Sequence, residues 1–104
     1  MSVLILAEHN NTELKTTTLN TITAASKLSE NINVLVLGFS CQVIIDKISK
    51  IPNIKTIISI DEEIFLNPIA EYIAPVIVSI ADKYTHILAP ASTFGKNVMP
   101  RVAA

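Results

Sequence analysis

Four short apolar runs recur along the chain, each followed by a stretch with helical periodicity, and this alternation limits the possible folds more than any other feature. Residues 3–7 read VLILA and residues 33–38 read NVLVLG, so the apolar residues are continuous rather than alternating. Residues 56–60 (TIISI) and 85–89 (THILA) repeat the pattern. Such runs are typical of strands buried on both faces, which occur in parallel sheets covered by helices. The sequence therefore predicts an α/β fold with four parallel strands.

Helical patterns occupy the segments between these runs. They cover residues 11–29, 40–50 and 64–84, and a fourth begins at Ser92 or Thr93 and continues to the last residue. We expect Asn10 to cap the first helix, because its side-chain oxygen can accept a hydrogen bond from a first-turn N–H group. Glu13, three residues later, would complete a capping box.

The third helical segment contains two prolines. Pro68 suits a first turn with Asn67 as the cap, because a first-turn N–H group has no partner within the helix. Pro75 lies inside the pattern, where we expect it to remove the bond to the Glu71 carbonyl and to bend the helix. The acidic residues 61–63 come before this helix, and they suit the positive end of its dipole.

The lengths of the connections predict the order of the strands. Each is long enough for a right-handed βαβ unit, so we expect a doubly wound sheet with the first three strands in the order 3-2-1 and the fourth on the other side of the first. A topological switch point, where such folds bind ligands, then falls between strands one and four. We expect two polar loops to line it: Glu8, His9, Asn10 and Asn11 from the first, and Pro90, Ser92, Thr93, Gly95 and Lys96 from the second.

The second of these loops invites comparison with a phosphate-binding P-loop, because Gly95 is followed by Lys96. The comparison fails, since Pro90 stands where the motif has its first glycine and Asn97 stands where it has its magnesium-binding hydroxyl. With only two glycines, the chain cannot contain a Gly-x-Gly-x-x-Gly dinucleotide loop either. A weaker prediction remains, in which a helix N-terminus with Ser92, Thr93 and Lys96 beside it accepts an anion. In the alternative that we favour, Ser92 or Thr93 is only a cap and Lys96 is a solvated residue.

The residues with reactive side chains form no catalytic pattern. Glu8 and His9 are neighbours in sequence and would point to opposite sides of an extended chain, and no nucleophile with a matching partner lies near them. His86 falls inside a predicted strand, which favours a structural role. Cys41 is the one cysteine, and we interpret it as a buried, inert thiol. Two histidines and one cysteine at scattered positions predict no metal site.

The composition and charge of the chain argue against a nucleic-acid-binding or membrane-inserted protein. Eight basic and nine acidic residues give a net charge of −1 without runs of like charge, which argues against nucleic acid as a partner. Half of the 104 residues are hydrophobic, yet the longest membrane-like stretch, 64–81, contains two prolines, an asparagine and a glutamate. We therefore expect no membrane insertion. The first residues lack the basic region of a signal or transit peptide, which together with the single cysteine predicts a cytoplasmic protein.

Several motifs resemble a known family along almost the whole chain. The segments VLILAEHNN (3–11), NVLVLG (33–38) and HILAPASTFGKNVMPRVAA (86–104) closely resemble the start of the electron-transfer flavoprotein alpha subunit. The last segment is the most specific. Its turn at residues 93–97 and the pair Pro100 and Arg101 match the alpha pattern rather than the beta pattern.

The resemblance implies a fold, a cofactor and partners. Such proteins are heterodimers that take electrons from flavin dehydrogenases, including those that oxidise acyl-CoA, and deliver them to a membrane-bound quinone oxidoreductase. The alpha N-terminal domain is a doubly wound, adenine-nucleotide-alpha-hydrolase-like α/β fold. FAD lies chiefly in the alpha C-terminal domain, and AMP lies on the beta subunit. Residues 1–104 would be the N-terminal portion of the first domain, so we expect no FAD contact among them.

The resemblance and the open edge of the fourth strand favour one reading of the function over two others. In it, the chain is a truncated alpha subunit, an electron-carrier fragment rather than an enzyme, which serves as a structural platform. An incomplete sheet of this kind should self-associate, because apolar faces and strand edges lose their cover. The alternative is a small adenine-nucleotide-binding module that uses the switch point. A third, small enzyme using Glu8 or His9 is the weakest reading.

Overall fold

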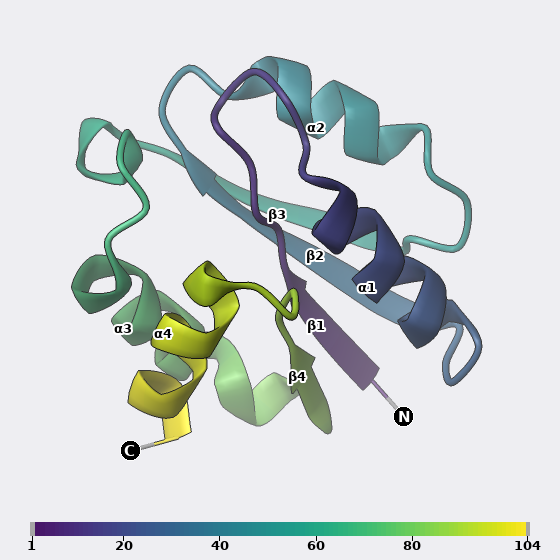
Figure 1. The fold of residues 1–104 in the computed structure, drawn as a ribbon. Helices are drawn as coiled ribbons and strands as arrows, with labels where there is room; N and C mark the ends of the chain where they lie inside the picture. Colours follow the sequence, from purple (N-terminus) through teal and green to yellow (C-terminus); the bar gives the residue numbers. More distant parts are fainter. Residues whose placement is uncertain (1, 104) are drawn as a thin grey trace.

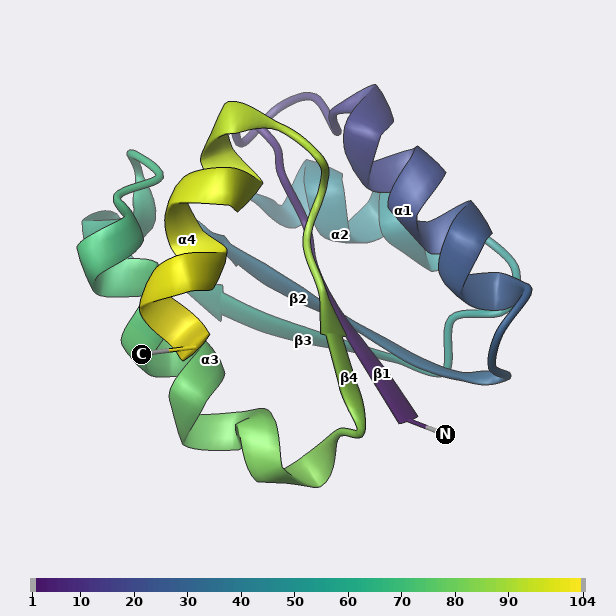
Figure 2. The same cartoon turned by 60° about the horizontal axis from the view of Figure 1, so that its bottom comes forward.

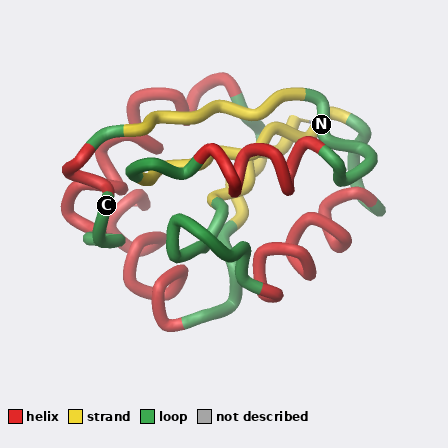
Figure 3. Tube along the Cα trace, turned by 90° about the horizontal axis from the view of Figure 1, so that it is seen from above, coloured by secondary structure: helices red, strands yellow, loops and turns green. Residues whose placement is uncertain are grey.

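In a computed structural model, which describes residues 2–103 and leaves out the side chain of Thr93, the chain alternates strands and helices (Figures 1 and 3). The strands are β1 (Ser2–Leu6), β2 (Asn31–Gly38), β3 (Thr56–Asp61) and β4 (His86–Leu88). The helices are α1 (Thr16–Ser26), α2 (Gln42–Ser49), α3 (Ala70–Ile80) and α4 (Thr93–Ala103), with the short 3-10 turns η1 (Glu63–Phe65) and η2 (Ala81–Lys83). The expected helical end at Ala104 and the first residue, Met1, lie outside the described residues.

Within residues 2–103 the sheet has four strands, all parallel, in the order β3-β2-β1-β4. This confirms the doubly wound topology, with the switch point between β1 and β4. Thr85 continues the β1–β4 pairing beyond the strand, because its N–H donates to the Ser2 carbonyl at 3.0 Å and its hydroxyl accepts from the Ser2 N–H at 3.0 Å. Figure 2 shows β4 beside β1 at one edge of the sheet.

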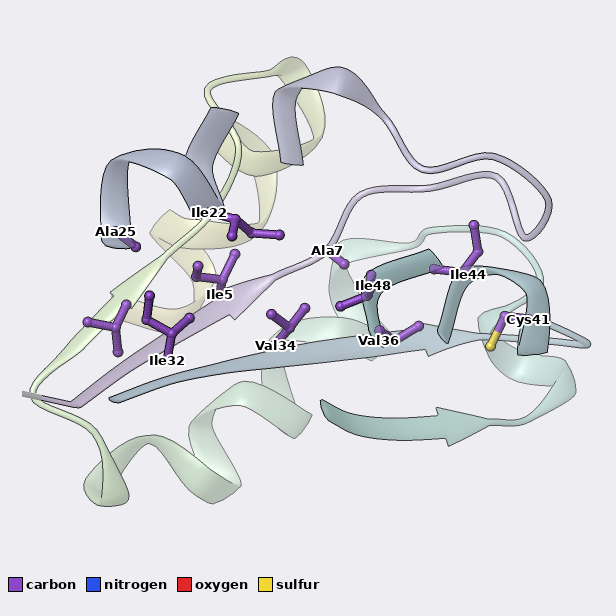
Figure 4. Packing of buried hydrophobic residues seen from close by; sticks show 11 residues of the cluster. Ile5, Ala7, Ile22, Ala25, Ile32, Val34, Val36, Cys41, Ile44 and Ile48 are labelled. Atoms are coloured by element: carbon purple, nitrogen blue, oxygen red, sulfur yellow. The ribbon is translucent and has the colours of Figure 1, made fainter. Parts of the chain in front are cut away.

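Helices cover both faces of the sheet and create two separate cores. α1 and α2 pack on one face, where the strands contribute mostly β-branched side chains such as Ile5 and Val34 (Figure 4). α3 and α4 pack on the other face, where the strands contribute leucines such as Leu4 and Leu35. Since side chains alternate along a strand, a continuous apolar run supplies both cores at once. This is the physical basis of the four runs in the sequence.

The first helix begins later than expected. α1 starts at Thr16, and its N-cap, Lys15, makes no side-chain capping bond. The Oδ1 atom of Asn10 instead accepts hydrogen bonds from the N–H groups of Thr12 and Glu13, at 3.1 and 2.7 Å. This is an Asx turn within the loop, so the predictions of an Asn10 N-cap and a capping box were wrong. An asparagine side chain can accept backbone N–H hydrogen bonds in a local turn as readily as at the start of a helix.

The third helix also begins later. α3 starts at Ala70 with Ile69 as its N-cap, so Asn67 and Pro68 lie before the helix and their predicted roles were wrong. Pro75 does lie inside the helix, as expected. Across residues 2–103, none of the helices has the length and apolar character that crossing a membrane would require.

Asp61, the last residue of β3, interacts with a different helix from the one that we predicted for the acidic residues 61–63. The Asp61 carboxylate accepts hydrogen bonds from the N–H groups of Ser40 and Cys41, at 2.8 and 3.1 Å, at the start of α2. The N-cap residue of α2, Cys41, makes no capping hydrogen bond with its own side chain. Those two bonds lower the pKa of Asp61, because they stabilise its charged form. Asp61 therefore caps α2 from a neighbouring strand, and it does not act on α3.

We expect the substitution Leu35→Ala to lower the free energy of unfolding by roughly 2–5 kcal/mol, because it opens a cavity in a fully buried part of the sheet. Urea unfolding followed by circular dichroism measures this. Val43→Ala, at a residue that is 50% exposed, is the matched control and should change stability by less than about 0.5 kcal/mol. Equal effects of the two substitutions would contradict the assignment of the core.

We expect Asp61→Asn to destabilise the protein at neutral pH, since the amide can accept only one of the two backbone bonds. The folded pKa of Asp61 is lowered, so its contribution is present above the usual value of 3.8 and disappears as the pH falls through the folded pKa. The stability difference between the two proteins should therefore shrink towards about pH 3. Asp46→Asn, on the exposed side of α2, should show no such convergence.

Candidate functional site

A cavity of about 340 Å³ lies at the carboxyl ends of β1 and β2, close to the switch point. Its apolar lining comes from the strand ends, from the segment between β3 and α3, from α3 itself and from the start of α4. The apolar lining residues are Leu6, Ala7, Leu37, Phe65, Leu66, Pro68, Ile73 and Phe94. The polar ones are Glu8, His9, Asn10, Asn11, Lys15 and Asn67. A largely apolar cavity with a few polar groups is the usual form of a small-molecule site.

His9 is fixed by both nitrogens of its ring. Its Nε2 atom lies 2.9 Å from the Leu37 carbonyl oxygen, and its Nδ1 atom lies 2.9 Å from the N–H of Asn11. A carbonyl can only accept and a backbone N–H can only donate, so these partners assign the proton to Nε2. Burial lowers the pKa of His9, and the bond to Leu37 offsets part of this effect. His9 is therefore a neutral strut rather than an available base.

Asn11 joins three loops at this end of the sheet. Its side-chain amide donates to the Leu66 carbonyl at 3.1 Å and accepts from the N–H of Phe39 at 2.9 Å. Its own backbone has a φ of 72°, a left-handed conformation in which asparagine is enriched. The residues that follow β1, β2 and β3 are thereby tied together. Sequence reasoning placed Asn11 in the crevice but missed this bridging role, because its partners lie 28 and 55 residues away.

Glu8 holds the loop between β1 and α1 against the start of that helix. Its carbonyl oxygen accepts from the N–H of Lys15 at 3.0 Å and from the hydroxyl of Thr18 at 3.1 Å. Its side chain accepts from the hydroxyl of Thr17 at 3.1 Å. Thr18 is fully buried, and its hydroxyl also accepts from the N–H of Glu8. The cavity therefore has walls that are formed before any ligand arrives.

Of the two loops that we expected to share one site, the first lines the cavity, whereas the described residues that we expected from the second do not. Asn10 lines the cavity, whereas Ser92, Gly95 and Lys96 are not among its described lining residues. The Ser92 hydroxyl accepts from the N–H of Gly95 at 3.2 Å, and the Ser92 carbonyl accepts from the N–H of Lys96 at 2.9 Å. Ser92 is thus the cap of α4, which agrees with the alternative that we favoured. The side chain of Thr93 lies outside the described part of the chain.

Phe94 is the cavity residue of the second loop that sequence reasoning missed. Its aromatic ring lines the cavity, as does that of Phe65 from η1. The only available signal was the apolar character of Phe94 within an otherwise polar turn. Both phenylalanines belong to the core on the α3 and α4 face. Packing of that core therefore decides where this side chain goes.

The remaining candidate groups lie away from the cavity. Cys41 is fully buried, and its burial raises the pKa of the thiol, with a further contribution from the Asp61 carboxylate. A protonated, enclosed thiol is a poor nucleophile, which agrees with the predicted inert role. His86 lies on β4 with its Nδ1 atom 3.0 Å from the Thr85 hydroxyl. Among residues 2–103, no group of three or more His, Cys, Asp or Glu side chains is arranged to hold a metal ion.

Comparison with known proteins identifies the family. The family model for the electron transfer flavoprotein domain matches residues 3–104. The chain belongs to the electron transfer flavoprotein family. It is 46% identical over 109 residues to the mitochondrial electron transfer flavoprotein subunit alpha of Dictyostelium discoideum, an alignment that covers 97% of this chain and 31% of that protein.

Two further electron transfer flavoprotein relatives give the same picture. The chain is 38% identical over 104 residues to the subunit alpha of Pseudomonas aeruginosa, covering all of this chain and 34% of that protein. It is 40% identical over 105 residues to a probable mitochondrial subunit alpha of Caenorhabditis elegans, covering 99% and 32%. The chain spans about a third of the length of the curated relatives it matches. It is therefore similar to the N-terminal portion of electron transfer flavoprotein alpha subunits, as the sequence motifs implied.

The state of His9 predicts how the stability of this electron transfer flavoprotein chain responds to mild acid. The folded pKa of His9 lies below the usual 6.5, so the unfolded chain binds the proton more readily. The contribution of neutral His9 is complete above about pH 6.5 and is lost as the pH falls through the folded pKa. Urea unfolding at several pH values should show this loss, and His9→Gln should flatten it. His86→Gln, a substitution on an exposed strand position, is the control and should keep the wild-type response.

Proposed function

We propose that this chain is part of the alpha subunit of an electron-transfer flavoprotein, which carries electrons from flavin dehydrogenases, including those that oxidise acyl-CoA, to a membrane-bound quinone oxidoreductase. Within that protein, residues 1–104 form the first part of the N-terminal α/β domain and act as a structural platform. They carry no catalytic centre of their own. The observation that supports this most is that similarity to alpha subunits extends over 97–100% of the chain.

We propose that FAD is held outside these 104 residues. A flavin dinucleotide needs a glycine-rich turn or an equivalent cradle for its phosphates. Both glycines of this chain lie where other atoms leave no room for a side chain. A Cβ on Gly38 would lie 2.6 Å from Asn11 Oδ1, and one on Gly95 would lie 2.0 Å from the Pro90 carbonyl oxygen. Glycine at these two positions is therefore explained by the lack of space for a side chain.

We further propose that the partner is the beta subunit of the same flavoprotein, and that AMP is bound there rather than on this chain. A cytoplasmic setting goes with this proposal, and the lone buried thiol of Cys41 is compatible with it. In this proposal the loops that His9 and Asn11 hold in place face the rest of the protein.

One observation favours a second candidate function, an adenine-nucleotide-binding module. The cavity lies near the switch point, where doubly wound folds bind nucleotides, and Lys15 lines it. Calorimetric titration with AMP distinguishes the two candidates. The platform role predicts no saturable heat, whereas a binding module predicts heat that Lys15→Ala reduces.

The platform proposal predicts that the purified chain is colourless and does not bind added FAD, because its flavin site lies elsewhere. A hybrid in which these residues replace the matching third of the Pseudomonas aeruginosa alpha subunit should still assemble with the beta subunit of that organism and retain flavin absorbance. The native Pseudomonas pair is the control. A yellow preparation of the 104 residues alone would overturn the proposal, and so would a folded hybrid that cannot pair with its beta subunit.

A further inference from the structure

The cavity at the carboxyl ends of β1 and β2 has an apolar floor and a polar mouth. Four of its apolar lining residues have at most 8% of their surface exposed: Leu6, Leu37, Phe65 and Ile73. Three of its polar lining residues are exposed: Asn10, Lys15 and Asn67. A ligand in this cavity therefore has an apolar body at the floor and its polar groups at the mouth.

Two aromatic rings line the cavity from different elements. Phe65 comes from η1, and Phe94 comes from the first turn of α4. Both also pack in the core on the α3 and α4 face, which fixes their positions. Fixed aromatic side chains favour a planar ring as the ligand, because ring faces and edges attract one another and a rigid ring loses little conformational freedom on binding.

The N–H groups of the loop after β1 are engaged within the chain. Those of residues 10–13 donate to the Glu13 carbonyl, the His9 ring and the Asn10 side chain, at 2.7–3.2 Å. The N–H of Lys15 donates to the Glu8 carbonyl at 3.0 Å. Nucleotide sites in doubly wound folds use free N–H groups of this loop and of the following helix to hold phosphates. The cavity therefore lacks the usual phosphate cradle.

The charged groups around the cavity balance each other. Glu8 and Lys15 line it with opposite charges, and His9 is held neutral by its two hydrogen bonds. No other titratable side chain among residues 2–103 lines this cavity. A site without net charge favours an uncharged ligand, because a charged one loses hydration without gaining an opposite charge.

Asn67 supplies a free hydrogen-bonding group at the mouth. Its side-chain amide forms no hydrogen bond with another residue in the described part of the chain. An amide has a donor beside an acceptor, so it pairs with a ligand edge that also presents a donor beside an acceptor. The edges of nucleobases have this pattern, and asparagine recognises adenine through it.

We propose that this cavity binds an uncharged, planar nitrogen heterocycle of the nucleobase type, free or as a nucleoside, and disfavours its phosphorylated forms. The ring packs against Phe65 and Phe94, and its hydrogen-bonding edge meets the amide of Asn67. This site differs from the AMP-binding module considered above, in which Lys15 contributes to affinity. The inference does not rest on the proposed electron-transfer role.

Calorimetric titration of the chain with adenosine and with AMP tests the class of ligand. Adenosine should give saturable heat with one site per chain. AMP should bind at least about tenfold more weakly, because its phosphate finds no free N–H group among residues 10–13. Ribose is the control ligand and should give no saturable heat.

Two substitutions test the residues that we assign to the ligand. Phe94→Leu and Asn67→Leu should each weaken adenosine binding by about tenfold, because one removes an aromatic contact and the other a hydrogen bond. Phe39→Leu and Asn20→Leu are the matched controls, since both residues are exposed and neither lines the cavity. They should change the affinity by less than about twofold. Circular dichroism checks that each variant keeps its fold.

Three results would overturn the inference. They are a folded chain that gives no saturable heat with adenosine, AMP binding as tight as that of adenosine, and equal losses from the cavity substitutions and their controls. An absence of adenosine binding would leave the platform proposal intact, because that proposal assigns no ligand to this chain.

Discussion

Burial of the two central strands on both faces is the constraint on which the rest of the structure depends. β1 and β2 pair with each other and each has a further strand on its outer side, so their backbone groups are satisfied within the sheet. Their side chains alternate between two cores, and residues such as Leu4, Ile5 and Leu35 have no exposed surface. Neither core can form without helices on its own side. The layered arrangement of α1 and α2 against α3 and α4 follows from this requirement.

The loops at the carboxyl end of the sheet depend on a second set of interactions, between side chains and backbone groups of different loops. Asn11 bridges to the segments after β2 and β3, His9 binds the end of β2, and Asp61 holds the start of α2. Each of these side chains satisfies backbone groups that no helix or sheet partner satisfies. They hold the loops that line the cavity in fixed positions relative to one another.

The outer surface is less uniform than the interior. Large apolar side chains are exposed on helices of both faces of the sheet, such as Leu19 on α1, Val43 on α2 and Val78 on α3.

The sequence by itself determined the fold class, the four strands and their order, because continuous apolar runs and helical connections leave few alternatives. It also predicted the buried thiol of Cys41 and a cap at Ser92 or Thr93, of which the structure shows Ser92, and both depend on local pattern. Helix starts were predicted poorly, since Asn10 and Asn67 have the chemistry of caps but lie in turns.

Only the tertiary structure decided which loop residues share a cavity. Phe94 lines it because it packs in the core, whereas Lys96, two residues further along the Ser92-capped helix α4, is exposed. The hydrogen bonds made by the side chains of Asn11 and Asp61 likewise connect residues that are 20 to 55 positions apart in the sequence. A local sequence pattern predicts only the contacts between residues that are a few positions apart. Contacts between distant segments exist only after the sheet has placed the ends of its strands side by side.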